Sequence, residues 1–170
     1  MISAAAPPAF PSARVRTLDL ADEAATLRLG DALATTARPR DVIALQGPLG
    51  AGKTAFARGF IAALARCQGV ELPSEVPSPT FTLVQTYAFG PVAVWHFDLY
   101  RISNADDAIE LGLDEALAEG ICLIEWPDRL GPRLPKDRLD LALAYGPTDQ
   151  ARVATLTGHG SWAERIADVA

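Results

Sequence analysis

Apolar residues recur at helical spacing and in short strand-like runs along the first part of the chain. Residues 22–37 mix alanine and leucine with charged residues, which predicts a surface helix. Residues 41–46 form a short apolar run typical of a buried strand, and residues 47–52 form a glycine-rich turn. Residues 53–68 then predict a helix that ends at Gly69. The apolar stripe of this helix consists of Phe56, Phe60, Leu64 and Cys67.

The second part of the chain contains strand-like runs separated by turn residues. Residues 80–89 and 92–97 are rich in β-branched and aromatic residues, and the Gly-Pro pair between them predicts a hairpin. Residues 121–124 form another short apolar run, as in a buried strand. Residues 138–145 and 152–156 alternate polar and apolar positions, which predicts two late strands.

Two further helices are expected between and after these strands. Residues 103–117 predict a helix that begins at Ser103 or Asn104 and is interrupted at Gly112. Residues 162–169 predict a short closing helix. Because helices and strands alternate at first and strands then dominate, we predict an α/β fold. Its sheet is expected to be mixed, mostly parallel and flanked by helices, with antiparallel strand additions.

The length and composition are those of one folded domain. The chain has 170 residues, of which 49% are hydrophobic and 21% charged. We predict a flexible, proline-broken leader over residues 1–14 and a single domain over residues 15–170. No apolar run is long enough to span a membrane. Cys67 and Cys122 lack a CxxC spacing, so we expect no disulfide framework, no cysteine-rich zinc site and a cytoplasmic location.

The charge balance argues against direct binding of a nucleic acid over a broad surface. Lysine and arginine total 15 against 21 aspartate and glutamate residues, which gives a formal net charge of −6. A phosphate backbone is bound by clustered positive charge, and this balance makes such clusters scarce. Lysine occurs only at positions 53 and 136, and Lys53 lies at the end of the glycine-rich turn.

The glycine-rich turn carries the strongest chemical signal in the sequence. Residues 47–54 read GPLGAGKT, which matches the pattern GxxxxGK[ST] between a predicted strand and a predicted helix. Backbone N–H groups of such a loop converge on phosphate oxygens, and the following helix presents its positive end to the same anion. We therefore predict a P-loop NTPase-like domain that binds ATP or ADP. The expected nucleotide-binding residues are Leu49, Gly50, Ala51, Gly52, Lys53 and Thr54.

Acidic residues at strand ends are candidates for the rest of the chemistry. Lys53 can reach the β- and γ-phosphates, and the Thr54 hydroxyl can ligate Mg²⁺. Asp98 and Glu125 each follow a predicted apolar strand. We predict that Glu125 binds Mg²⁺ together with Thr54, and that Asp98 orients or deprotonates the attacking water. The two acids could exchange these roles. The predicted catalytic residues are therefore Lys53, Asp98 and Glu125.

Several other residues have two interpretations each. Residues 78–82 form either a switch that senses the γ-phosphate or an ordinary connecting loop. His96 lies in an apolar strand, which favours a core histidine with satisfied hydrogen bonds over a metal ligand. Trp126 is interpreted as a core or interface residue rather than a platform for a base. The arginines that either supply charge to a transition state or lie on the surface are Arg58, Arg101 and Arg129.

Motifs that the sequence lacks narrow the class of nucleotide enzyme. A signalling GTPase requires an Asn-Lys pair to read guanine, and the sequence contains none, which leaves ATP as the expected nucleotide. Residues 135–170 lack the clustered arginines of a kinase lid. A small-molecule kinase and a nucleotide-sensing binding module remain the alternatives to an ATPase.

Four blocks of sequence, in this order, resemble the TsaE (YjeE) family of bacterial P-loop ATPases. The blocks are GPLGAGKT at 47–54, SPTFTLV at 78–84, HFDLYR at 96–101 and LIEWPDR at 123–129. The resemblance extends from about residue 17 to about residue 156. Four ordered blocks are more specific than the phosphate loop alone.

The resemblance implies a Mg²⁺-dependent ATPase required for threonylcarbamoyladenosine (t6A) formation in tRNA. Such a protein acts with TsaB and TsaD, and we expect hydrolysis to be slow alone and controlled by these partners. In the family, the loop threonine and the glutamate of the LIEW block ligate Mg²⁺, which correspond here to Thr54 and Glu125. The aspartate of the HFDLYR block, here Asp98, is important for activity. Contact with tRNA is expected mainly through the partners, and no membrane contact is expected.

Overall fold

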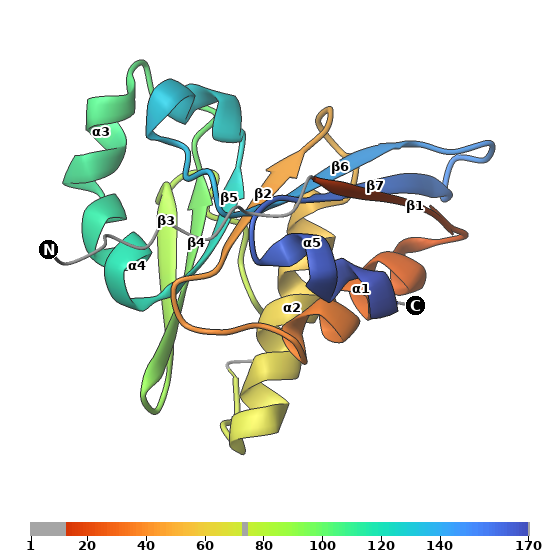
Figure 1. Ribbon diagram of the computed structural model, residues 1–170, viewed down its shortest axis with the longest axis horizontal. Coiled ribbons are helices and arrows are strands. Elements are labelled where there is room, and N and C mark those ends of the chain that lie inside the picture. The colour runs from red at the N-terminus through yellow and green to blue at the C-terminus, as the bar shows by residue number, and fades with distance from the viewer. Residues whose placement is uncertain (1–12, 73–74, 170) are drawn as a thin grey trace, which may run out of the picture.

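The computed structural model describes residues 13–72 and 75–169, and in this part of the chain seven strands form one sheet (Figure 1). The strand order across the sheet is β1-β7-β6-β2-β5-β4-β3. The strands are β1 (Arg14–Leu20), β2 (Val42–Gln46), β3 (Val84–Phe89), β4 (Val92–Asp98), β5 (Ile121–Glu125), β6 (Leu139–Tyr145) and β7 (Arg152–Gly158). The α-helices are α1 (Glu23–Ala34), α2 (Lys53–Gln68), α3 (Ala105–Glu110), α4 (Leu113–Glu119) and α5 (Trp162–Arg165). The 3₁₀ helices are η1 (Pro127–Arg133) and η2 (Ile166–Asp168).

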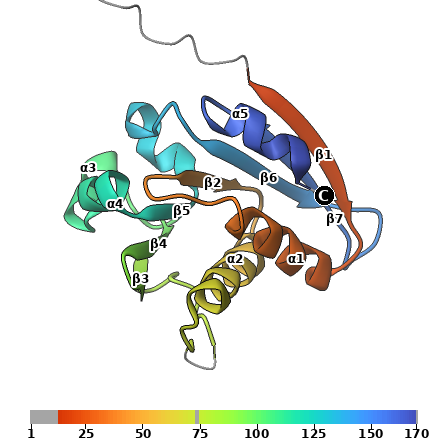
Figure 2. The ribbon, with the colours of Figure 1, turned by 60° about the horizontal axis from the view of Figure 1, so that its bottom comes forward.

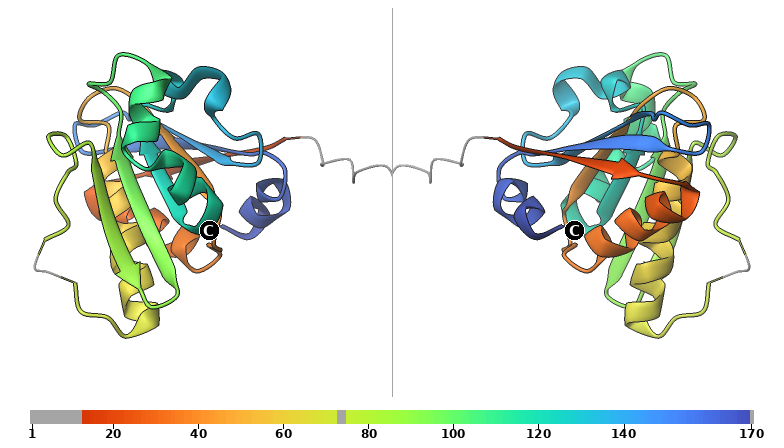
Figure 3. Two further views of the ribbon diagram at one scale, coloured as in Figure 1. Left: turned by 90° about the vertical axis from the view of Figure 1, so that its left-hand side faces the viewer. Right: turned by 90° about the vertical axis from the view of Figure 1, so that its right-hand side faces the viewer.

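The centre of the sheet is parallel and its two edges are antiparallel. Strands β6, β2, β5 and β4 pair parallel to one another in this order. At one side β7 and then β1 continue the sheet antiparallel, and Figure 3 shows β1 lying alongside β7. At the other side β3 and β4 form an antiparallel hairpin. The predicted α/β fold with antiparallel additions is confirmed, but the sheet is parallel only in its centre rather than mostly parallel, because three of its six strand pairings are antiparallel.

Helices cover both faces of the sheet (Figure 2). On one face the core contains side chains of α1, α2 and α5, such as Leu33 and Phe60. On the other face a smaller cluster contains side chains of α3, α4 and η1, such as Leu113 and Leu130. The central strands β2 and β5 are therefore buried on both faces, as their continuous apolar runs predict.

Helices α1 and α2 touch through their backbones. A Cβ atom built on Gly59 would lie 2.2 Å from the carbonyl oxygen of Leu27, and one built on Gly30 would lie 2.4 Å from that of Phe56. Neither position accepts a larger side chain unless the helices move apart. The close approach fixes how α1 lies against α2, and the first turns of both helices line the same cavity.

The first predicted elements differ from the structure only in detail. Helix α1 is shorter than the predicted range 22–37 at both ends: Asp22 is its N-cap and accepts a hydrogen bond from the first turn, and Thr35 is its C-cap. Helix α2 coincides with the predicted range 53–68 and ends at Gly69, which has a φ of 66°. The apolar stripe of α2 is wrong at one position, because Cys67 is exposed.

Later elements show larger differences. The predicted strand over residues 80–89 is too long: β3 begins at Val84, because the preceding residues form a turn in which Leu83 has a φ of 67°. The predicted interrupted helix is a pair of helices, α3 and α4, that meet at Gly112, and Asn104 caps the first. The predicted closing helix consists of α5 and η2.

Strand β1 is not predicted by the sequence pattern. Its side chains are mostly exposed or half-buried, so it lacks the apolar run of a central strand. Arg14, the last residue of the predicted leader, is its first residue, and residues 1–12 lie outside the described residues. Among the helices that the structure describes, none is both long and apolar enough to cross a membrane.

Candidate functional site

The glycine-rich loop joins the carboxyl end of β2 to the first turn of α2. Gly47, Gly50 and Gly52 have φ values of 137°, 74° and 104°, which side-chain-bearing residues rarely adopt. A Cβ atom on Gly47 would also lie 2.3 Å from the carbonyl oxygen of Leu143. No described side chain caps α2 at Gly52, so the N–H groups of its first turn remain free for a ligand. These N–H groups and the helix dipole favour an anion at this position.

The Lys53 side chain lies against the inside of this loop. Its ammonium donates hydrogen bonds to the carbonyl oxygens of Gly47 (2.8 Å) and Pro48 (2.9 Å), and only 5% of the residue is exposed. It also lies 4.5 Å from the ring centroid of Trp126, a cation–π contact. Burial lowers the pKa of Lys53, and the carboxylates at the ends of β5 and β4 oppose this shift. The cation is therefore held by neutral groups and can pair with an anion that enters the loop.

Thr54 and Glu125 meet behind the loop. Glu125 is the last residue of β5, which pairs with β2, and this pairing brings its carboxylate beside the start of α2. Its Oε1 accepts hydrogen bonds from the Thr54 hydroxyl and from His96 Nε2, each at 2.9 Å. The two predicted magnesium ligands are thus in direct contact. His96 is fully buried, as predicted, but its Nδ1 has no hydrogen-bond partner in the part of the chain that the structure describes, so the prediction that its hydrogen bonds are satisfied is wrong.

Asp98 lies next to Glu125 at the end of β4. The two residues are register partners on neighbouring parallel strands, so their side chains share a face of the sheet. Asp98 Oδ1 accepts a hydrogen bond from the backbone N–H of Tyr100 (3.0 Å), and Oδ2 accepts one from the Thr80 hydroxyl (3.2 Å). Thr80 in turn shares a 2.7 Å hydrogen bond with the Ser78 hydroxyl. The loop considered as a switch therefore contacts the site through Thr80.

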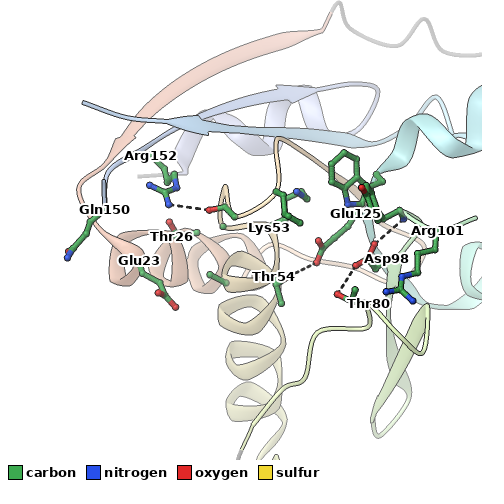
Figure 4. A pocket seen from close by; sticks show the side chains of 16 residues that line it. Glu23, Thr26, Lys53, Thr54, Thr80, Asp98, Arg101, Glu125, Gln150 and Arg152 are labelled. Atoms are coloured by element: carbon green, nitrogen blue, oxygen red, sulfur yellow. Dashed lines mark hydrogen bonds between the residues drawn. The ribbon is translucent and has the colours of Figure 1, made fainter. Parts of the chain in front are cut away.

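These side chains line one cavity of about 430 Å³ (Figure 4). The predicted site residues that line it are Leu49, Gly50, Gly52, Lys53, Thr54, Asp98 and Glu125. Ala51 does not line the cavity: its side chain is buried, and its N–H donates to the carbonyl oxygen of Pro48 at 3.1 Å. Trp126, interpreted as a core or interface residue, is half-buried and borders the cavity.

The other end of the cavity contains residues for which the sequence predicts no role. These are Glu23 and Thr26 from α1, Gln150 from the β6–β7 connection and Arg152 from β7. Arg152 Nη2 donates a hydrogen bond to the carbonyl oxygen of Gly50 (3.2 Å), and the Tyr145 hydroxyl donates one to that of Leu49 (2.6 Å). No sequence motif connects these positions with the loop. The sheet order, in which β6 lies between β2 and β7, brings Tyr145 and Arg152 to the loop, and the close contact of α1 with α2 brings Glu23 and Thr26 to it.

The three candidate arginines occupy different places. Arg101 lines the cavity, and its guanidinium lies 4.7 Å from the ring centroid of the exposed Phe81. Arg58 lines a separate groove, where its Nε donates a hydrogen bond to the carbonyl oxygen of Val76 (2.9 Å). Arg129 is exposed in η1 and is not among the residues that line the cavity. Of the three, Arg101 alone is placed to act on a bound ligand.

The side-chain oxygen atoms at the site suit Mg²⁺, which takes further ligands from water and phosphate. They suit less well a metal ion that only protein side chains would bind. Among the described residues, no group of three or more His, Cys, Asp or Glu side chains is arranged to bind a metal. Thr54 offers a hydroxyl, and Glu125 and Asp98 offer carboxylates, which are all hard oxygen donors. Mg²⁺ is usually bound by one or two such protein groups together with water and substrate phosphates. The residues present therefore fit a magnesium ion that arrives with a phosphate ligand.

Comparison with known proteins gives consistent matches over most of the chain. Residues 20–153 match the family model described as "Threonylcarbamoyl adenosine biosynthesis protein TsaE". The tRNA threonylcarbamoyladenosine biosynthesis protein TsaE of Bacillus subtilis (strain 168) is 36% identical over 79% of this chain and 80% of its own length. The protein of the same name from Streptomyces coelicolor is 38% identical over 79% of this chain and 92% of its own length.

A solved structure shows the same relationship in three dimensions. The crystal structure of YdiB from Bacillus subtilis matches with a TM-score of 0.72 and 29% sequence identity. The match covers 93% of this chain and 95% of that chain. Together with the family model, which covers well over half of the sequence, these relatives show that the chain belongs to the TsaE family of threonylcarbamoyl adenosine biosynthesis proteins.

Proposed function

We propose that this chain is a Mg²⁺-dependent P-loop ATPase required for t6A modification of tRNA, acting with TsaB and TsaD. The observation that carries the proposal is the 2.9 Å contact between Thr54 and Glu125 behind the loop that encloses the Lys53 ammonium. A hydroxyl and a carboxylate beside an anion-binding loop are the groups that hold Mg²⁺ against nucleotide phosphates in P-loop enzymes. The relatives are named as tRNA threonylcarbamoyladenosine biosynthesis proteins, which supports the assignment to this process.

Each residue has a role that its surroundings support. The N–H groups at the start of α2 bind phosphate oxygens, and Lys53 exchanges its carbonyl partners for the β- and γ-phosphates. Thr54 and Glu125 hold Mg²⁺, which when bound supplies positive charge to the phosphate oxygens. Asp98 orients or deprotonates the attacking water, because its carboxylate lies beside Glu125 on the same face of the sheet.

Hydrolysis is slow in the isolated chain because the Thr80 hydroxyl and the Tyr100 N–H each occupy one acceptor site of the Asp98 carboxylate, which leaves fewer sites for the attacking water. A movement of the loop over residues 78–82 that withdraws Thr80 leaves its acceptor site to a water molecule. Phe81, which is 82% exposed, follows Thr80 directly and offers an apolar contact to a partner. Docking of TsaB and TsaD at this loop would therefore couple partner binding to the reactivity of Asp98.

The partners, rather than this chain, make most of the contact with tRNA. The formal net charge of −6 leaves little positive charge to bind a phosphate backbone over a broad surface. The proposed process takes place in the cytoplasm and involves no membrane contact.

The first test is nucleoside mass spectrometry of bulk tRNA from the host, after depletion of this protein and after its restoration. We expect the t6A level to fall on depletion and to be restored by the wild type but not by Lys53→Ala. Lys136→Ala is the matched control, because it removes the only other lysine, which is exposed and outside the cavity. An unchanged t6A level after confirmed depletion would overturn the assignment to this process.

A second test distinguishes an ATPase from a kinase or a nucleotide-sensing module with the same phosphate loop. The purified chain, with TsaB and TsaD, is expected to release phosphate from ATP into water and to require Mg²⁺. Transfer of the phosphoryl group to an added metabolite, without release to water, would instead identify a small-molecule kinase. Tight ATP binding with no turnover beside TsaB and TsaD would identify a nucleotide-sensing module.

A further inference from the structure

His96 occupies a position in the sheet where the core would accept an apolar side chain. Val94, His96 and Asp98 alternate onto one face of β4, and the neighbouring positions of β5 on this face include Leu123. His96 is 0% exposed and its register partner Leu123 is also 0% exposed. A buried imidazole costs free energy that an apolar residue would not, unless its polar atoms are used. Within residues 13–72 and 75–169, the imidazole of His96 makes one hydrogen bond, to Glu125.

The direction of this hydrogen bond follows from its chemistry. A carboxylate oxygen can only accept, so His96 Nε2 carries the hydrogen and donates it to Glu125 Oε1 at 2.9 Å. The same oxygen accepts the Thr54 hydroxyl, also at 2.9 Å. Oε2 has no hydrogen-bond partner among the described residues, although Glu125 lines the cavity. Two donors therefore saturate one oxygen of the carboxylate and leave the other to a ligand.

We propose that His96 is a positioning residue for the magnesium site: its Nε2–H fixes the Glu125 carboxylate so that Oε1 stays on Thr54 and Oε2 faces the cavity. The inference rests on the function proposed above, in which Glu125 and Thr54 hold Mg²⁺. A glutamate side chain has several rotamers, and a second donor from a neighbouring strand restricts it to one. His96 is itself fully buried beside Leu123 of β5, so its orientation is restricted before any ligand enters.

A pair of substitutions separates positioning from packing. His96→Leu fills the position with an apolar side chain of moderate size and removes the hydrogen-bond donor. His96→Gln instead keeps an N–H donor at a similar reach. His159 provides the matched control, because its Nε2 contacts Asp140 Oδ2 at 2.8 Å outside the cavity. His159→Gln is therefore expected to leave the site unchanged.

The first readout is nucleotide binding by the full chain as a function of Mg²⁺ concentration. We expect His96→Leu to raise the Mg²⁺ concentration for half-maximal ATP binding about 10-fold, the lower end for loss of such a supporting partner. ATP affinity in EDTA is expected to stay within about 2-fold of wild type, since the loop and Lys53 are untouched. His96→Gln is expected to recover most of the Mg²⁺ dependence. A purely structural role would shift both affinities together and would not distinguish the two variants.

The second readout needs no nucleotide. Long-range ¹H–¹⁵N NMR spectra of the histidine rings, assigned with His96→Gln and His159→Gln, report which nitrogen of each ring carries the hydrogen. We expect His96 to be the Nε2–H tautomer and its resonance to shift in Glu125→Gln, while that of His159 stays in place. This measurement also decides the case if His96→Leu fails to fold, which its circular dichroism spectrum would reveal.

The outcomes of the two readouts are distinguishable. A folded His96→Leu with wild-type Mg²⁺ dependence, or a His96→Gln that behaves like His96→Leu, overturns the positioning role. A His96 ring protonated only at Nδ1 overturns it as well. A wild-type chain that binds no ATP at any Mg²⁺ concentration overturns the proposed function instead, and with it the metal that His96 would serve.

Discussion

The two ends of the cavity are built in different ways. At the end near β4 and β5, Lys53, Asp98 and Glu125 are each at most 5% exposed and each makes hydrogen bonds within the chain. At the end near α1 and β7, Glu23 and Gln150 are exposed and Arg152 is half-buried, and only Thr26 among the four residues at this end is buried. The first end is a buried network that exists before a ligand arrives, and the second is an open rim.

This difference determines what each end can contribute. Electrostatic interactions are stronger in a buried site because little water screens them, and fixed groups need no rearrangement when charge develops. Exposed side chains compete with water, so their individual effects on affinity are small. We therefore expect substitutions at the buried end to change the rate of hydrolysis strongly, and substitutions at the open rim to change nucleotide affinity weakly.

The largest effect is expected at Lys53. Lys53→Ala removes the one cation that the loop holds against the proposed phosphates. We expect ATP hydrolysis with TsaB and TsaD to fall by about 100-fold or more, because a group that stabilises transition-state charge is lost. Phosphate release under saturating ATP measures this. Lys136→Ala serves as control, and a Lys53→Ala chain that hydrolyses ATP at the control rate would remove the distinction between the two ends.

The next largest effect is expected at Asp98, and it separates the roles of the two acids. Asp98→Asn keeps the acceptor for the Tyr100 N–H but cannot take a proton, so we expect hydrolysis to fall by about 100-fold while Mg²⁺-dependent ATP binding persists. Asp128→Asn, at an exposed aspartate in η1, is the control. If Asp98→Asn abolished the Mg²⁺ dependence of binding instead, Asp98 and Glu125 would have exchanged roles.

The buried end could be predicted from the sequence because its residues follow local rules. The glycines of the loop, Lys53 and Thr54 are adjacent in the chain, and the range of α2 follows from its apolar spacing. Asp98 and Glu125 end apolar strands, and parallel neighbouring strands bring such ends to the same edge of a sheet. The contact between His96 and Glu125 was beyond this reasoning, because it depends on which strands are neighbours and on which face each residue lies.

The open rim could not be predicted because contacts between elements that are distant in the sequence create it. Strand β1 has no apolar run, and it is held in the sheet by pairing with β7. Arg152 reaches the loop only because β7 lies beside β6, which in turn pairs with β2. The start of β3 differs from its prediction for a similar reason: the turn before Val84 is stabilised by contacts such as Thr80 with Asp98, which are distant in sequence.

A moderate effect is expected at Arg152. Its Nη2 hydrogen bond to the Gly50 carbonyl holds the tip of the loop from outside. Arg152→Ala removes this bond, worth about 1 kcal/mol, so we expect ATP affinity to fall about 5-fold with little change in the rate at saturating ATP. Calorimetric titration with ATP measures the affinity, and Arg129→Ala is the control outside the cavity. A loss of rate rather than affinity would mean that the rim also takes part in catalysis.

The smallest effect is expected at Asp22, the N-cap of α1. Its carboxylate accepts a hydrogen bond from the N–H of Ala25 at 2.7 Å, and this cap fixes the helical turn that carries Glu23 and Thr26 to the rim. Asp22→Ala is expected to lower the free energy of unfolding by about 1 kcal/mol, measured by urea denaturation, because an N–H of the first turn loses its partner. Asp22→Asn retains an acceptor and is expected to stay close to wild type. We expect ATP affinity to change less in Asp22→Ala than in Arg152→Ala. The reason is that the backbone contact of α1 with α2 at Gly59 still holds the helix in place.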